Sequence, residues 1–135
     1  DEADYVRWRE SVNVQPTVSH KPASDTLLVY KHAYDLVLYF YNVNRNVERE
    51  FKFSLSEKIK EELHEVLMNI CFANEEVSKE RKLQLVGQAN NVLASAKIRI
   101  RLLHDLKQLP LKHYAAFAEK ITDLSSELNK WKEAI

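Results

Sequence analysis

Residues 93–114 read LASAKIRIRLLHDLKQLPLKHY, and they carry the clearest signal of the architecture. Its apolar residues Leu93, Ala96 and Ile100 repeat at spacings of three and four, which is the period of one buried face of a helix. Pro110 ends the pattern, because proline cannot continue a helix but is well tolerated in the first turn of the next one. The stretch therefore predicts two helices that are joined by a short turn and pack as antiparallel neighbours.

The same period extends in both directions from this turn. It predicts one helix over residues 79–108 and another from Pro110 to residue 135, whose buried seam is Tyr114, Phe117, Ile121, Leu124, Leu128, Trp131 and Ile135. Two further helices precede them. The first begins at Ser24, a candidate N-cap, and the second begins at Ser54, which forms a capping-box pattern with Glu57.

Four helices with short connections predict an all-α, up-down-up-down antiparallel four-helix bundle over residues 24–135. Residues 1–23 differ, since their apolar residues follow no helical period and Pro16 and Pro22 interrupt them. We interpret this segment as an extended N-terminal arm or tail. A length of 135 residues suits a single domain.

Composition excludes several classes of function. The single glycine rules out a glycine-rich phosphate loop, and the equal numbers of acidic and basic residues remove the bulk-charge argument for nucleic-acid binding. No apolar stretch is long enough to cross a bilayer, and the acidic start is unlike a signal peptide. We expect a cytoplasmic protein with no membrane contact and no cofactor, in which the lone Cys71 is a buried small apolar residue.

Two short patterns could carry chemistry. Glu61 and His64 have the spacing of a di-iron ligand pair, but the sequence holds no second copy of that pair. Arg99, followed by His104, resembles the catalytic motif of the HEPN ribonucleases, which are also helical bundles. A spacing of five residues places these two side chains on different faces of one helix, about 140° apart. We therefore expect a protein that is not an enzyme, with the ribonuclease as an alternative.

Charge is distributed unevenly along the chain. Residues 79–108 hold seven basic residues against two acidic ones, whereas residues 54–76 hold six acidic residues against two basic ones. Lys97 and Arg101 lie one helical turn apart and predict a ridge that can face phosphates. The candidate binding residues are Lys97, Arg101, Arg99, Arg81, Lys82 and Lys107. The alternative is that these cations pair with the acidic face of a neighbouring helix or subunit.

Residues 26–135 resemble the accessory variability determinant family, the four-helix-bundle proteins that accompany the reverse transcriptase of diversity-generating retroelements. The resemblance rests on the stretch from Lys97 to Leu106, on Leu109 to Tyr114, and on the spacing from there to Trp131. In the first half, residues 51–59 (FKFSLSEKI) resemble the loop into the second helix of the family. The arm has no counterpart in the family, and residues 125–130 replace a glycine-rich turn.

The resemblance implies a bacterial or phage-encoded homopentamer that contacts reverse transcriptase and RNA, and possibly DNA, through a basic surface during mutagenic retrohoming. Lys97 and Arg101 match the basic positions of the family. The related bundle proteins that are encoded within ribosomal RNA intervening sequences share the fold, and they remain an alternative.

Overall fold

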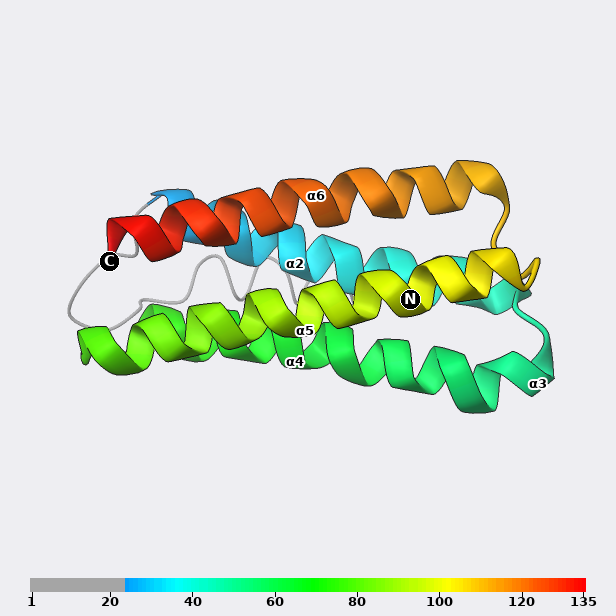
Figure 1. Ribbon diagram of the computed structural model, residues 1–135, viewed down its shortest axis with the longest axis horizontal. Coiled ribbons are helices and arrows are strands. Elements are labelled where there is room, and N and C mark those ends of the chain that lie inside the picture. Colours follow the sequence, from blue (N-terminus) through cyan, green and yellow to red (C-terminus); the bar gives the residue numbers. More distant parts are fainter. Residues whose placement is uncertain (1–23) are drawn as a thin grey trace, which may run out of the picture.

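Four long helices make up the described part of the chain (Figure 1). The computed structural model describes residues 24–135, with side chains from Leu27 onward, so the predicted arm lies outside the described residues. The long helices are α2 (Ser24–Val43), α4 (Glu57–Glu75), α5 (Lys79–Asp105) and α6 (Leu111–Ala134). Between α2 and α4 the chain forms a 3-10 turn, η1 (Asn44–Asn46), a short helical turn, α3 (Arg49–Phe51), and a π-helical segment, η2 (Lys52–Ser56).

The four long helices form a closed ring around one core. Each packs against its neighbour in the chain, and α2 also packs against α6, so that α2 lies diagonally across from α5 (Figure 1). The α4–α5 contact is the most extensive of these. The predicted up-down-up-down four-helix bundle is therefore confirmed.

The buried residues follow the predicted seams. The seam of α5 is buried, and its residues are Val86, Ala89, Leu93, Ala96, Ile100 and Leu103. The central residues of the α6 seam, from Phe117 to Trp131, are buried with them. Phe117 packs against Phe40 of α2, with their ring centroids 5.9 Å apart. In α2 the core takes the stripe of Val29, Leu36 and Phe40, while the tyrosines on the adjacent stripe stay partly or largely exposed.

One helix start was predicted wrongly. The segment that leads into α4 is already helical from Arg49, where the amides of Phe51 and Lys52 donate to the carbonyl of Glu48. Ser54 does not cap a helix, because its hydroxyl donates to the carbonyl of Glu50, four residues earlier. A serine inside a helix can make this bond, which competes with its role as a cap.

The end of α5 also differs from the prediction, because the helix stops at Asp105 rather than at Gln108. The amide of Gln108 donates to the carbonyl of Leu103, and the amide of Lys107 donates to that of His104. These two bonds form a Schellman motif, which requires a left-handed residue just past the helix end. Lys107 takes that conformation, with φ at 68°, in a position that glycine normally fills, and this costs about 1 kcal/mol.

Polar side chains cross-link neighbouring helices near the surface. His32 Nδ1 lies 2.7 Å from Glu127 Oε1 between α2 and α6, and Tyr41 Oη lies 3.0 Å from His64 Nε2 between α2 and α4. Asn90 Nδ2 donates to Asn129 Oδ1 between α5 and α6. These contacts help to fix the register between the helices, and therefore which side chains remain free to bind a partner.

Candidate binding surface on helix α5

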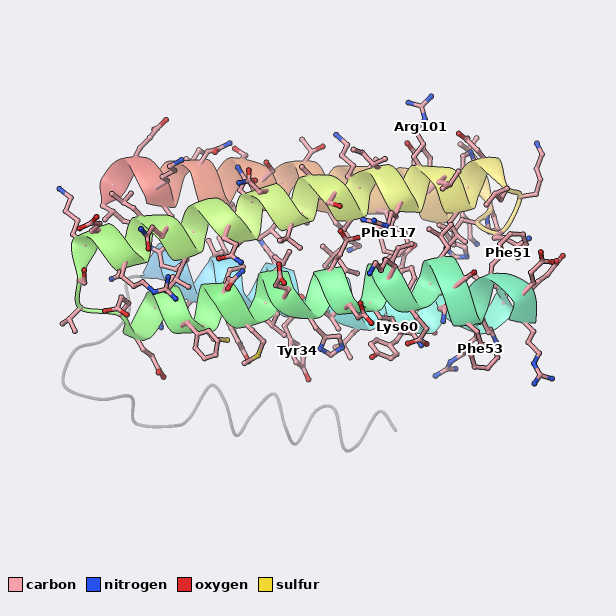
Figure 2. All side chains as sticks on the ribbon, turned by 60° about the horizontal axis from the view of Figure 1, so that its bottom comes forward. Tyr34, Phe51, Phe53, Lys60, Arg101 and Phe117 are labelled. Carbon is pink, nitrogen blue, oxygen red and sulfur yellow. The ribbon has the colours of Figure 1, made fainter. Side chains whose placement is uncertain are left out.

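Lys97 and Arg101 form the predicted ridge, and both are exposed. Lys97 borders a groove between α5 and α6, and Arg101 points into solvent along the same edge of the bundle (Figure 2). Arg101 Nε lies 3.8 Å from Asp105 Oδ2, in a pair whose two side chains are both more than half exposed. A pair of this kind contributes little and leaves the guanidinium available to a phosphate.

Small residues line part of the groove beside Lys97. Ala94 forms part of its α5 side, and Thr122, Ser125 and Ser126 form part of its α6 side. It encloses about 590 Å³ and is open to solvent. Lys130 stands on the α6 side of the groove, so that a strand lying across it would meet a cation from each helix.

An apolar stripe runs along α5 next to the ridge. Ile98 is 72 % exposed, and Leu102 and Leu106 follow at intervals of one helical turn and are also exposed. Sequence reasoning missed this stripe, although its residues fall outside the buried seam and could have been found on that ground. Exposed apolar groups that lie together and are bordered by charges are typical of surfaces that bind proteins.

Arg99 lies apart from the ridge, on the side of α5 that faces α4. Its Nη1 donates to Glu62 Oε2 of α4 and to Ser95 Oγ, at 2.7 Å in each case. Glu62 is largely buried, which strengthens the pair relative to one at the surface. The first role of Arg99 is therefore to join α5 to α4.

The other three candidate cations lie near the two ends of α5. Arg81 and Lys82 are in the first turn, where the Arg81 guanidinium donates to Gln84 Oε1. Lys107 follows the last turn, at the opposite end of the bundle. The six predicted residues thus do not form one surface, and only Lys97 and Arg101 are adjacent on an open face.

His104 has a structural partner as well. Its Nδ1 lies 2.8 Å from the carbonyl oxygen of Leu109, to which it must donate, and its ring stacks on Tyr114 with the centroids 4.5 Å apart. His104 therefore faces the turn into α6, whereas Arg99 faces α4. Within one chain, the structure does not bring together the two residues of the ribonuclease-like pattern.

The di-iron-like pair has no supporting ligands. His64 is bonded to Tyr41, and nowhere in residues 24–135 do three or more histidine, cysteine or acidic side chains gather in a way that could hold a metal ion. Burial, together with the nearby charge of Glu75, raises the pKa of Cys71 to about 11. The thiol is half-buried rather than fully buried as predicted.

Aromatic and cationic side chains also meet on the α2–α4 face, which sequence reasoning did not identify. Lys60 Nζ lies 5.0 Å from the ring centroid of Tyr41, and Arg49 Cζ lies 5.7 Å from that of Phe53. Figure 2 shows Tyr34, Lys60 and Phe53 along the edge of the molecule that lies opposite Arg101. This face is thus separate from the ridge on α5.

These features define an all-helical bundle protein with a basic ridge and an apolar stripe on one helix. No family model matches the chain, and no curated relative is similar enough to be matched. Among solved structures, the fold is similar to that of a protein of unknown function from Bacteroides thetaiotaomicron, which belongs to the S23 ribosomal protein family. The TM-score is 0.74 at 14 % identity, over 81 % of this chain and 98 % of the other, so the likeness extends to the fold alone.

No helix within residues 24–135 is long and apolar enough to cross a membrane.

Proposed function

We propose that this chain is a non-catalytic, oligomeric adaptor that binds RNA and a protein partner through α5. The observation that carries the proposal is the position of the Lys97–Arg101 ridge beside the exposed stripe of Ile98 and Leu102. A cationic ridge suits phosphates, and an apolar stripe suits a protein surface. One helix thus offers adjacent contacts for two kinds of partner.

The charge of α5 supports the RNA contact. Lys97 carries no ion pair among the described residues, and Arg101 has only the long, exposed contact with Asp105. The acidic residues of α4 lie on another helix, where one of them, Glu62, is paired with Arg99. A neutral protein can therefore present a locally positive surface to a polyanion.

The identity of the protein partner rests on the sequence resemblance. We propose that the partner is the reverse transcriptase of a diversity-generating retroelement, and that the adaptor holds template RNA and polymerase together during mutagenic retrohoming. In this proposal the adaptor performs no chemistry, which agrees with the structural roles of Arg99 and His104.

Reversing the charge of the ridge tests the RNA contact. In the Lys97→Glu/Arg101→Glu variant, RNA retention should fall, and the slope of log affinity against log salt should decrease by about 1.4, or roughly 0.7 for each lost phosphate contact on a single strand. The matched control is Lys31→Glu/Lys58→Glu, which changes the net charge equally on exposed positions of α2 and α4. An unchanged slope in the ridge variant would show that the ridge does not hold RNA.

The apolar stripe gives the second test. Ile98→Ser/Leu102→Ser removes exposed side chains, so the bundle should stay folded while retention of the reverse transcriptase is lost and that of RNA persists. Co-purification with the polymerase measures the first quantity, and filter binding measures the second. Normal co-purification of the polymerase with this variant would place the protein contact elsewhere.

A second candidate is a ribosomal RNA-associated bundle protein of the intervening-sequence type. The support for this candidate is that the chain shares its bundle fold with the solved structure from the S23 ribosomal protein family. Sequencing the RNA that co-purifies from cells separates the candidates, since the adaptor should recover retroelement template RNA and the second candidate should recover ribosomal RNA.

A further inference from the structure

The end of the bundle that carries the α5–α6 turn has a hollow of its own. Two turns enclose it, one after α2 and one after α5, and both lie at the same end of the molecule (Figure 1). The backbone amide of Glu48 donates to Gln108 Oε1 at 2.8 Å and thereby fastens one turn to the other. The hollow spans about 690 Å³, is open to solvent, and has among its lining residues Asn46, Asp105, Lys107, Gln108, Pro110 and Leu111.

Lys107 is the unusual residue of this hollow. It holds a left-handed backbone conformation that favours glycine, and yet it presents a long cationic side chain. Strained residues of this kind tend to occur where the side chain has a role in binding. The fold alone would be served better by glycine at this position, so the lysine side chain points to a ligand that carries negative charge.

The lining divides into a polar part and an apolar part. Lys107, Asn46 and Asp105 offer an ammonium, an amide and a carboxylate, while the exposed Pro110 and Leu111 form an apolar wall. Leu111 is 70 % exposed, so this wall is open to an incoming group. Gln108 is buried, and both ends of its side-chain amide are hydrogen-bonded. Its Oε1 accepts from the amide of Glu48, and its Nε2 donates to the carbonyl of Leu106. These bonds hold the Gln108 side chain in place at the base of the hollow.

The surrounding charge is positive. Besides Lys107, this end of the bundle carries four cations that form no ion pair among the described residues, namely Arg45, Arg49, Lys52 and Lys112. Arg45 and Lys112 directly adjoin the lining residues Asn46 and Leu111 in the chain. The acidic residues here are Glu48, Glu50 and Asp105, and Asp105 also lies near Arg101. The cations outnumber the acids, and the excess favours an anion.

We propose that this hollow binds a single nucleotide unit, with its phosphate against Lys107 and its base against the wall of Pro110 and Leu111. The carboxylate of Asp105 is placed to accept from a ribose hydroxyl or from an exocyclic amine, which gives that acid a role beside an anionic ligand. The unit is either a free mononucleotide or the phosphorylated end of an RNA strand. The site goes beyond the proposed function, since a nucleotide would bind here even if the ridge bound no RNA.

The test is a titration of the full chain with adenosine 5′-monophosphate. Binding is monitored by amide chemical shifts and by calorimetry. The shifts should concentrate on residues 104–111 and Asn46, and adenosine or inorganic phosphate alone should bind at least about tenfold more weakly, because each offers only half of the contacts. Lys107→Gly should weaken binding of the nucleotide by about tenfold through loss of a charge-assisted contact. The same substitution relieves the backbone strain, so its melting temperature should rise, and a loss of binding then cannot come from unfolding.

Two controls accompany the variant. Lys107→Arg keeps the charge and should keep the affinity, and Lys58→Ala removes an exposed cation on α4 and should leave the affinity unchanged. Equal binding of the nucleotide by Lys107→Gly and by the unaltered chain would overturn the proposal. So would adenosine or inorganic phosphate binding as tightly as the nucleotide, or shifts centred outside the hollow.

A competition experiment separates the two sources of the nucleotide. A short RNA with a 5′-phosphate should displace the mononucleotide, and the same RNA without the phosphate should not, if the hollow takes a strand end. Displacement by neither RNA, with the mononucleotide still bound, assigns the hollow to a free nucleotide. A Lys97→Glu variant, which weakens the ridge and leaves the Arg101–Asp105 pair beside the hollow intact, should retain mononucleotide binding, so that failure of the ridge and failure of the hollow are seen separately.

Discussion

At the scale of single residues, neighbouring cations of α5 have different roles. Lys97 and Arg101 face open solvent beside α6, whereas Arg99 is held by Glu62 and Ser95 on the side facing α4. The difference follows from helix geometry, because a step of two residues turns the side chain by about 200°. Adjacent basic residues in a sequence therefore need not share a surface.

The Arg99–Glu62 pair should contribute to stability. Arg99→Ala leaves the largely buried Glu62 carboxylate unpaired, and the free energy of unfolding should fall by about 1–3 kcal/mol in urea titrations. Replacing Glu62 with leucine in the same chain should restore most of the loss. Arg101→Ala, whose pair is long and exposed, should change stability by less than about 0.5 kcal/mol. Equal small effects of Arg99→Ala and Arg101→Ala would contradict a structural role for Arg99.

Cys71 should react slowly with thiol reagents. Burial raises its pKa to about 11, so near pH 8 its thiolate fraction is roughly a hundredfold below that of an ordinary cysteine. Because the pKa is raised, the rate of disulfide exchange with an aromatic disulfide should keep rising up to about pH 11 rather than level off near 8.5. The control is Ser126→Cys in a Cys71→Ser background, at an exposed position. Matching rate profiles at the two positions would refute the assignment.

At the scale of the elements, the start of α4 shows the limits of a local motif. The pattern from Ser54 to Glu57 is that of a capping box, but the chain is helical before it and passes through the π-helical segment η2. A side-chain N-cap forms only at the residue where a helix begins. Ser54 lies inside helical structure, and its hydroxyl donates to the carbonyl of Glu50. Among α4, α5 and α6, whose starts are described, the side-chain cap is Ser78, whose hydroxyl accepts from the amide of Arg81 at the start of α5.

The two serines should therefore respond differently to substitution. Ser78→Ala removes a cap and should lower the free energy of unfolding by about 1 kcal/mol. Ser54→Ala removes only an exposed bond within a helix and should change it by less than about 0.5 kcal/mol. Thermal or urea unfolding of the two variants in parallel measures both values. A larger loss for Ser54→Ala would mean that the capping box forms after all.

At the scale of the whole molecule, the bundle is polarised although its net charge is zero. Basic and apolar groups are exposed on α5, while α4, an adjacent helix of the ring, carries five acidic residues against two lysines. This arrangement allows two neighbouring copies to complement each other, and it equally allows α5 to remain open to RNA. The masses of the unaltered chain and of the ridge variant in solution distinguish pairing between subunits from binding of RNA.

Light scattering should give a mass about five times the 15.8 kDa of one chain, as the family resemblance implies. The Lys97→Glu/Arg101→Glu variant should keep that mass, because the proposal assigns the ridge to RNA and not to contacts between subunits. Dissociation of the variant would instead assign these cations to pairing with a neighbouring subunit. A monomer at all concentrations would remove the oligomeric part of the proposal.

The four helices, their seams and the antiparallel turn at Pro110 can be predicted from the amino-acid sequence, because the heptad period and proline geometry are encoded within a few neighbouring residues. Which cations are free depends instead on tertiary contacts. Arg99 is taken by Glu62, 37 residues away, and the hollow beside Lys107 exists because Glu48 meets Gln108, 60 residues away. Such pairings depend on the register in which whole helices pack, and this register is set by the complete core rather than by any local pattern.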